Sequence, residues 1–226
     1  MIISSGKPGG IWDIGLGIRW DAASFAQQVS RRAEQLSRMN IGRGSLVGIL
    51  HNGTAHFFAD LFATWSVGAT AACLDSELTN AELKTIVDFA KPAILLVGRV
   101  SRSVHLAIPV ADLETSPPAD WGCAAEFHAD DAALVLFTSG TTGNPKGVVL
   151  TFRALLARVS ANAGVIGSAV LRRSLVALPT HFGHGLIGNS LTPLLNGGEI
   201  ILHPLGPTLA SNLGRLIDEY RISFMS

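Results

Sequence analysis

The chain has 226 residues, of which 48% are hydrophobic and 15% are charged, and its 17 Lys and Arg residues balance its 17 Asp and Glu residues. This composition excludes a disordered chain and suffices for a sizeable buried core in one or two domains. The neutral balance creates no field that attracts a polyanion, so we expect no nucleic acid partner.

The N-terminal residues lack the charged segment and apolar run of a signal peptide, and no apolar stretch reaches membrane-spanning length. We therefore expect a cytoplasmic protein without a membrane span. Cys73 and Cys123 are far apart in the sequence, which fits neither a zinc site nor a disulfide framework. We interpret both as reduced core residues.

The first part of the chain alternates helix and strand. Helical spacing of apolar residues predicts helices over 20–39, 54–67 and 79–90, and short apolar runs predict strands over 45–50, 70–74 and 93–97. The helix over 54–67 is apolar on nearly all sides, which indicates a position inside a large core. Thr79 and Glu82 have the spacing of a capping box.

The second part continues this alternation, with strands predicted over 104–110, 133–137, 148–151, 174–178, 199–203 and 222–226. Helices are predicted over 152–165, 184–195 and 208–220, and residues 114–130 are interpreted as a surface connection. Alternating strands and helices predict an α/β fold, in which a largely parallel sheet has helices on both faces.

A loop rich in glycine and hydroxyl groups follows the strand over 133–137. Glycine allows backbone N–H groups to turn inward and form an anion-binding nest, to which hydroxyl groups add donors and a lysine adds charge. The spacing differs from a Walker loop, because Pro145 stands where the second glycine is required, and it also differs from Gly-x-Gly-x-x-Gly. We predict a phosphate site formed by Thr138, Ser139, Gly140, Thr141, Thr142, Gly143 and Lys146.

The run Thr138-Ser-Gly-Thr-Thr-Gly-Asn-Pro-Lys-Gly147 resembles the signature loop of the acyl-adenylate-forming superfamily, which includes the acyl-CoA synthetases. Leu178-Pro-Thr-His-Phe-Gly-His-Gly-Leu186 is similar to the next motif of that family. The resemblance implies that residues 1–226 are the N-terminal part of an AMP-binding domain, without its C-terminal part and lid domain. It also implies the layered fold of the large N-terminal domain of such an enzyme.

The resemblance further implies a reaction. A carboxylic acid would be activated with ATP and Mg²⁺ as an acyl-adenylate and then transferred to a thiol, such as that of CoA or of a carrier protein. The loop would bind the ATP phosphates, and Lys146 would be catalytic because it offsets the charge of the leaving pyrophosphate. The acid could be fatty, aryl or dicarboxylic.

The second motif suggests an acyl pocket or gate formed by His181, Phe182, His184 and Gly185. The family commonly places a gating histidine three residues after Pro179, where this chain has Phe182. Histidines satisfied by hydrogen bonds in the core are an equal alternative at these positions. Leu186 and Asn189 are weaker candidates for lining the pocket, because apolar helix faces are more often core.

Relatives in this superfamily carry adenine, ribose and magnesium sites that do not occur before Ser226. We therefore expect the chain alone to be inactive and to be an incomplete piece of the enzyme, a view favoured by the predicted buried strand over 222–226. Two alternatives stay open. One is a naturally short binding or partner module that has kept the phosphate loop and lost catalysis. The other is a full-length ligase that no longer adenylates but transfers a preformed acyl-adenylate to CoA. A partner chain that supplies the missing half-site also stays open.

Overall fold

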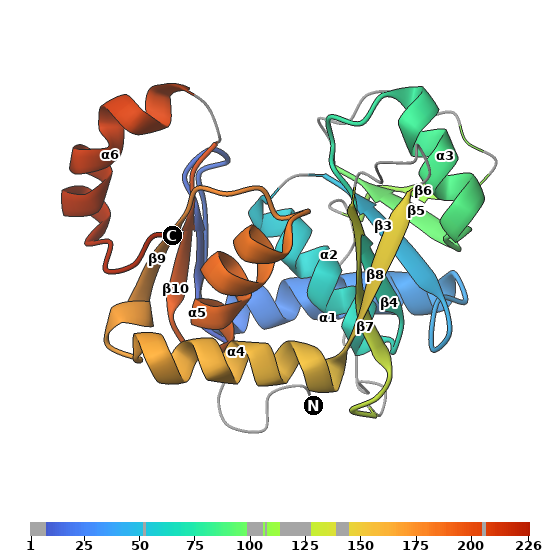
Figure 1. Ribbon diagram of the computed structural model, residues 1–226, viewed down its shortest axis with the longest axis horizontal. Coiled ribbons are helices and arrows are strands. Elements are labelled where there is room, and N and C mark those ends of the chain that lie inside the picture. The colour runs from blue at the N-terminus through green and yellow to red at the C-terminus, as the bar shows by residue number, and fades with distance from the viewer. Residues whose placement is uncertain are drawn as a thin grey trace. The chain divides into compact units, whose positions relative to one another are not determined.

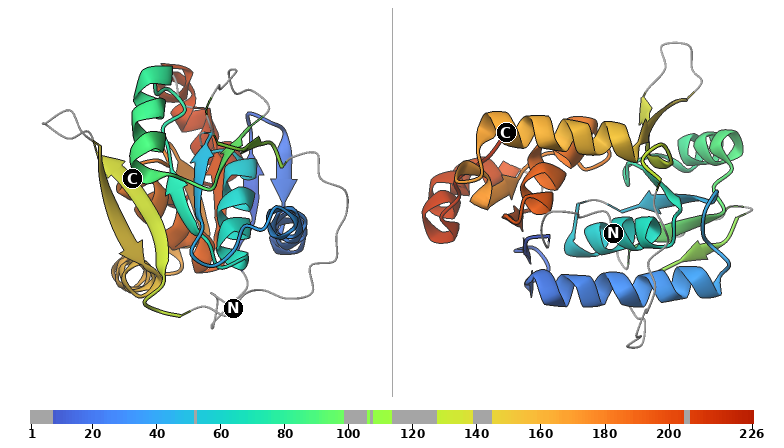
Figure 2. Two further views of the ribbon diagram at one scale, coloured as in Figure 1. Left: turned by 90° about the vertical axis from the view of Figure 1, so that its right-hand side faces the viewer. Right: turned by 90° about the horizontal axis from the view of Figure 1, so that it is seen from below.

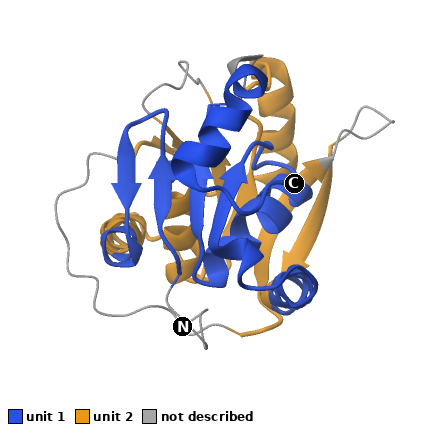
Figure 3. Ribbon diagram, turned by 90° about the vertical axis from the view of Figure 1, so that its left-hand side faces the viewer, with its two compact units in different colours: residues 1–26, 53–55, 153–226 blue, residues 27–52, 56–152 orange. Residues whose placement is uncertain are grey.

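A computed structural model of the chain describes residues 8–51, 53–98, 106, 108–113, 128–138, 145–204 and 207–226. Figure 1 labels its α-helices and most of its strands. The chain divides into two compact units, one formed by residues 1–26, 53–55 and 153–226 and the other by residues 27–52 and 56–152, which Figure 3 colours separately. Each unit contains one sheet.

The unit formed by residues 27–52 and 56–152 contains a six-stranded sheet of order β6-β5-β3-β4-β7-β8. Its neighbours are parallel except for the antiparallel pair β7 and β8 at one edge. The largely parallel arrangement predicted from the alternation of elements is thus confirmed, but the strands are divided between two sheets and do not form a single one. The strands of the six-stranded sheet are β3 (Leu46–Leu50), β4 (Thr70–Cys73), β5 (Ile94–Val97), β6 (Val110–Ala111), β7 (Ala132–Thr138) and β8 (Lys146–Thr151).

Three helices accompany this sheet: α1 (Ala22–Arg38), α2 (Ala55–Ser66) and α3 (Asn80–Ala90). From β3 the chain moves to β4 through α2, and it then returns through α3 to β5 on the other side of β3. The helices α2 and α3 cover opposite faces of the sheet (Figure 2), as the general rule of right-handed parallel crossovers predicts for this strand order. The predicted capping box is present, since Thr79 accepts from the backbone of Glu82 and the Glu82 carboxylate accepts from the Thr79 N–H.

Apolar side chains fill both faces of this sheet. On one face, α3 packs its buried residues against the strands, in a cluster of Leu50, Leu74, Leu83, Ile86, Val87 and Leu95. The helix α2 is almost wholly buried, as its composition predicts, and the Trp65 indole N–H donates to the Ala133 carbonyl at 2.8 Å. Burial raises the pKa of the Cys73 thiol to about 12, so this thiol stays protonated at neutral pH.

The other unit contains a four-stranded sheet of order β2-β1-β10-β9. It combines β1 (Ile11–Asp13), β2 (Ile18–Trp20), β9 (Arg173–Val176) and β10 (Glu199–Leu202). The pairs β1–β10 and β10–β9 are parallel, whereas β1 and β2 are antiparallel. The sequence analysis did not predict β1 and β2, because three residues are too few to reveal a period.

The helices of this unit are α4 (Phe152–Ile166), a short 3₁₀ turn (Val170–Arg172), the π-helix η2 (His184–Leu191), α5 (Thr192–Leu195) and α6 (Pro207–Tyr220). The predicted helix over 184–195 is present, and its first eight residues are π-helical. π-Helical segments are rare and frequently occur at functional sites.

The predicted strand over 222–226 was wrong. Pairing there is limited to one bridge, in which Phe224 lies parallel to Ser174 of β9 and its carbonyl accepts from the Leu175 N–H at 2.9 Å. Of the predicted strand over 104–110 and the predicted connection over 114–130, only residues 106, 108–110 and 128–130 are described. Among the described helices, none is long and apolar enough to cross a membrane.

Candidate functional site

The predicted phosphate loop joins two paired strands. β7 and β8 form an antiparallel ladder in which Phe137 lies opposite Gly147 and Thr138 lies opposite Lys146 (Figure 1). Both ends of the loop are therefore held at adjacent backbone positions. Ser139, Gly140, Thr141, Thr142 and Gly143 of the predicted site lie outside the described residues.

This hairpin opens at the carboxyl edge of the six-stranded sheet. Ile49 of β3 lies beside Cys73 of β4, which lies beside Leu136 of β7, and all three strands run in the same direction. Thr138, two residues beyond Leu136, therefore lies where β7 leaves the sheet. Open parallel α/β sheets bind ligands outside the carboxyl ends of their strands, and Thr138 and Lys146, the paired residues on either side of the loop, lie at this favoured edge.

Lys146 is exposed and is the first residue of β8. The sequence analysis placed it in the loop and began the strand at Val148. Pairing with β7 extends the strand because both Lys146 and Gly147 have partners across the ladder. Gly147 has little room for a side chain, since a Cβ there would lie 3.1 Å from Cγ1 of Val135 and 3.4 Å from Cε1 of Phe137.

A buried network of His51, Asp60 and Arg32 lies at the end of β3, which is separated from β7 by β4 alone. His51 directly follows β3, and its Nε2 lies 2.8 Å from Oδ2 of Asp60 in α2. The other oxygen of Asp60 accepts from the Nε of Arg32 in α1 at 2.8 Å. These residues are 7%, 2% and 1% exposed, respectively. Because an ionised carboxylate can only accept, Nε2 of His51 is the donor in this hydrogen bond.

The remaining nitrogens of Arg32 also have partners. One terminal nitrogen donates to the side-chain oxygen of Gln28 at 2.8 Å, and the other lies 2.8 Å from Nδ1 of His56. The sequence analysis missed this network. The signal that could have revealed it is Asp60, the single carboxylate in a largely apolar helix, because a buried carboxylate requires a partner.

The second group of predicted site residues follows β9. The rings of His181 and Phe182 lie 4.2 Å apart between centroids, with 54° between their planes. Phe182 is 56% exposed. His184, the exposed first residue of η2, is hydrogen-bonded through Nε2 to the Ser226 hydroxyl. The structure thus brings these aromatic and imidazole rings together on one short loop and the start of one helix.

Gly185 is a packing requirement of this loop. A Cβ at Gly185 would lie 2.2 Å from the carbonyl oxygen of Pro179 and 3.0 Å from Cβ of Leu178, closer than a side chain permits. The expectation that Leu186 and Asn189 line a pocket is not supported, since both are fully buried. The amide of Asn189 is used in hydrogen bonds to β9 and to the residue after it.

The predicted residues therefore form two local groups. Thr138 and Lys146 belong to the unit with the six-stranded sheet, whereas His181, Phe182, His184 and Gly185 belong to the unit with the four-stranded sheet. The first group provides a cation and a strand end suited to an anion. The second provides rings and imidazole nitrogens suited to an organic group.

Comparison with known proteins identifies relatives of the whole chain. A family model described as "AMP-binding enzyme" matches residues 11–226. The chain is 32% identical over 198 residues to the hybrid PKS-NRPS synthetase pydA of Acremonium sp, covering 83% of this chain and 5% of that protein. It is 29% identical over 190 residues to the 2-succinylbenzoate–CoA ligase of Bacillus pumilus, covering 82% and 39% respectively.

Solved structures share the fold. The O-succinylbenzoate coenzyme A synthetase MenE of Bacillus subtilis, in complex with AMP, superposes with a TM-score of 0.82 at 22% identity, covering 95% of this chain and 57% of that one. The N-terminal subdomain of Klebsiella oxytoca NpsA gives a TM-score of 0.83 at 20% identity, covering 97% and 55%. The chain thus spans little more than half the length of these solved structures, and at most 39% of the length of the two relatives named above.

Proposed function

Since the chain belongs to the AMP-binding enzyme family, we propose that its protein activates a carboxylic acid with ATP as an acyl-adenylate. The carboxylate oxygen forms a bond to the α-phosphorus, and the bond to the bridging oxygen breaks, so that pyrophosphate leaves. A thiol then attacks the acyl carbon, loses its proton, and displaces AMP. The observation that carries this proposal is the β7–β8 hairpin, which presents Thr138 and Lys146 at the carboxyl edge of the sheet.

In this proposal Lys146 contacts the phosphates that leave as pyrophosphate. Its exposed position at the mouth of the loop supports this role, because a lysine stabilises charge that develops on a transferring phosphoryl group. Thr138 and the hydroxyl and glycine residues from 139 to 143 supply further donors. Mg²⁺ held by the polyphosphate would neutralise part of its charge. No described group of three or more His, Cys, Asp and Glu residues forms a separate metal site.

The identity of the acid is the finer part of the proposal. One relative is by name a 2-succinylbenzoate–CoA ligase, and one solved neighbour is in complex with 3-hydroxybenzoyl-AMSN. We propose an acid with an aryl or other apolar body, bound beside His181, Phe182, His184 and Gly185. The exposed ring of Phe182 supports this choice, since aromatic rings bind apolar bodies by stacking.

The thiol acceptor is either CoA or a carrier protein. A CoA ligase and a hybrid PKS-NRPS synthetase are both among the relatives. The match covers 39% of the CoA ligase but only 5% of the synthetase, and for this reason we propose CoA. The acceptor is decided by adding CoA or a phosphopantetheinylated carrier protein to the adenylation reaction. Formation of acyl-CoA supports the proposal, and loading of the carrier alone contradicts it.

The test of adenylation uses ATP–pyrophosphate exchange by the full-length protein that contains this chain. Octanoate, succinate, 3-hydroxybenzoate and 2-succinylbenzoate represent the fatty, dicarboxylic and aryl classes. With the best acid, Lys146→Ala is expected to lower kcat/KM by about 10- to 150-fold, the equivalent of one charge-assisted contact of roughly 1.5–3 kcal/mol.

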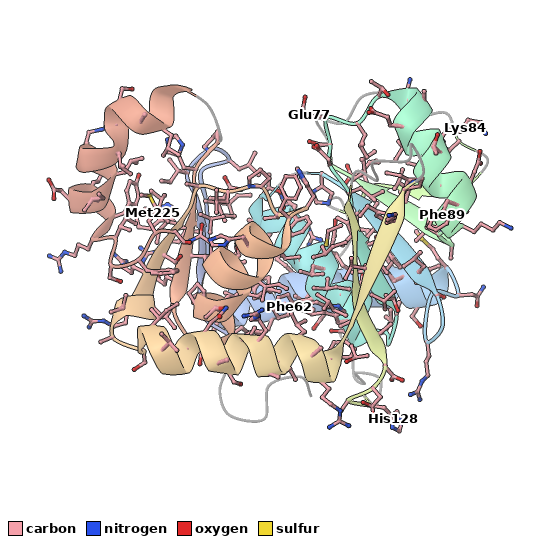
Figure 4. All side chains as sticks on the ribbon, viewed as in Figure 1. Phe62, Glu77, Lys84, Phe89, His128 and Met225 are labelled. Atoms are coloured by element: carbon pink, nitrogen blue, oxygen red, sulfur yellow. The ribbon has the colours of Figure 1, made fainter. Side chains whose placement is uncertain are left out.

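The matched control is Lys84→Ala. Lys84 is an exposed lysine of the same unit that projects from α3 and pairs with Asp88 one helical turn away (Figure 4). Its loss should leave exchange unchanged. Equal activity of Lys146→Ala and wild type would remove Lys146 from the proposal, and absence of exchange with every acid would contradict adenylation itself.

A further inference from the structure

Asn189 connects the π-helix η2 with the strand end that leads to the predicted acyl site. Its side-chain nitrogen donates to the Ser174 hydroxyl and to the Leu175 carbonyl, both at 3.1 Å. Its side-chain oxygen accepts from the N–H of Ala177 at 3.4 Å. The Ser174 hydroxyl in turn donates to the backbone carbonyl of Asn189 at 2.9 Å. One fully buried residue therefore fixes η2 to the last part of β9 and to the first residue of the loop.

The loop that begins at Ala177 is held at further points by its own backbone. The Pro179 carbonyl accepts from the N–H of Phe182 at 3.4 Å, and the Phe182 carbonyl accepts from the N–H of Leu186 at 2.9 Å. Gly185 lies directly against Pro179, as its lack of space for a Cβ indicates. The position of the loop thus depends on where η2 lies.

The π-helical geometry of η2 is itself stabilised by side chains. The Ser190 hydroxyl donates to the Gly185 carbonyl at 2.8 Å, and the Thr192 hydroxyl donates to the Ile187 carbonyl at 2.7 Å, in both cases five residues back. Both hydroxyl residues are fully buried. The wide turns place Asn189 toward β9 while His184 stays exposed at the start of the helix.

We propose that Asn189 is a positioning residue that sets the acid specificity of the site. It acts through Ala177 and η2 on the loop that carries His181, Phe182 and His184, and it does not contact the acid. This inference rests on the proposed function, because it assumes that this loop binds the acid. An amide is required at this position, since an apolar side chain of the same size would leave Ala177 N–H and Leu175 C=O without a partner.

The test compares Asn189→Leu with Asn162→Leu in the full-length protein. Asn162, in α4, donates to the Thr192 hydroxyl at 3.2 Å and bonds neither to β9 nor to the loop. Asn162→Leu therefore also removes a hydrogen bond to this helical segment, but not one that holds the loop. Asn189→Leu should raise KM for the best of the four acids by about tenfold or more, or reverse the order of preference among them, while KM for ATP stays within about twofold. Asn162→Leu should change neither constant.

A milder variant keeps the test decisive if Asn189→Leu fails to fold. Ser174→Ala removes one partner of the amide and leaves the bonds to Leu175 and Ala177, so it should raise KM for the acid by a smaller factor. Acid KM values within about twofold of wild type in both variants would overturn the inference and leave adenylation intact. Equal rises of the acid and ATP constants in Asn189→Leu and Asn162→Leu would also overturn it, because a general loss of structure would then explain both.

Hydrogen exchange separates this inference from the proposed function. In peptides covering residues 177–187, Asn189→Leu should increase exchange of the Phe182 and Leu186 amides, and Asn162→Leu should not. Increased exchange supports positioning by Asn189 even if none of the four acids is adenylated. Unchanged exchange contradicts positioning, whatever the activity of the wild-type protein.

Discussion

At the scale of single residues, Gly185 provides a sharp structural test. Gly185→Ala places a methyl group 2.2 Å from the Pro179 carbonyl oxygen, so the loop or the start of η2 must shift. We expect a loss of about 1–3 kcal/mol in the free energy of unfolding, the usual cost of overpacking, and a higher KM for the acid. Urea denaturation measures the change in the free energy of unfolding, and ATP–pyrophosphate exchange measures the change in KM.

The same helix contains the control for this prediction. At Gly188, the methyl group of an alanine would meet no atom within 4 Å beyond the adjacent residues and the backbone of its own helix, so Gly188→Ala should be neutral or slightly stabilising. Similar destabilisation by both substitutions would show that η2 tolerates no alanine at all. In that case the contact with Pro179 would not be the cause.

At the scale of elements, the buried pair of Arg32 and Asp60 connects α1 with α2. Asp60→Leu leaves the guanidinium of Arg32 buried without its carboxylate, which we expect to cost about 3–5 kcal/mol in the free energy of unfolding. The double variant Arg32→Met/Asp60→Leu should recover part of this loss, because it removes the unpaired guanidinium, whereas Nε2 of His51 lacks its carboxylate partner in both variants.

Denaturation followed by tryptophan fluorescence, to which the fully buried Trp65 of α2 contributes, measures this coupling. Lys84→Met/Asp88→Leu provides the comparison, because it removes a pair in which both side chains are more than half exposed, so little change is expected. If the double variant at Arg32 and Asp60 is no more stable than Asp60→Leu alone, the pair does not act as a coupled unit.

Elements longer than about ten residues were predicted well, because their periodic pattern repeats often enough to exceed chance. The helices α1, α2, α3, α4 and α6 differ from prediction by no more than two residues at either end. The π-helical geometry of η2 was not predicted. A π-helix requires hydrogen bonds between residues five apart, and the buried hydroxyl groups of Ser190 and Thr192 add two such bonds to backbone carbonyls here.

At the scale of the molecule, we propose that the chain is an incomplete piece of the enzyme. The intact mass of the protein as its native cell produces it should then lie well above 23.7 kDa, and residues 1–226 alone should show no ATP–pyrophosphate exchange. A native mass near 23.7 kDa would contradict this and would direct the search to a partner chain that supplies the missing half-site. Exchange by residues 1–226 alone would contradict it as well.

The amino-acid sequence by itself determined the α/β class, the phosphate-loop signature and the family, because these depend on local periods and on a contiguous motif of ten residues from Thr138 to Gly147. Only the tertiary structure decided the pairing of β1 with β10, the network of His51, Asp60 and Arg32, and the bonds of Asn189 to β9. These contacts join residues that are distant in the chain. These contacts form because the residues are buried together and because buried polar groups require hydrogen-bond partners, neither of which can be read from a local sequence pattern.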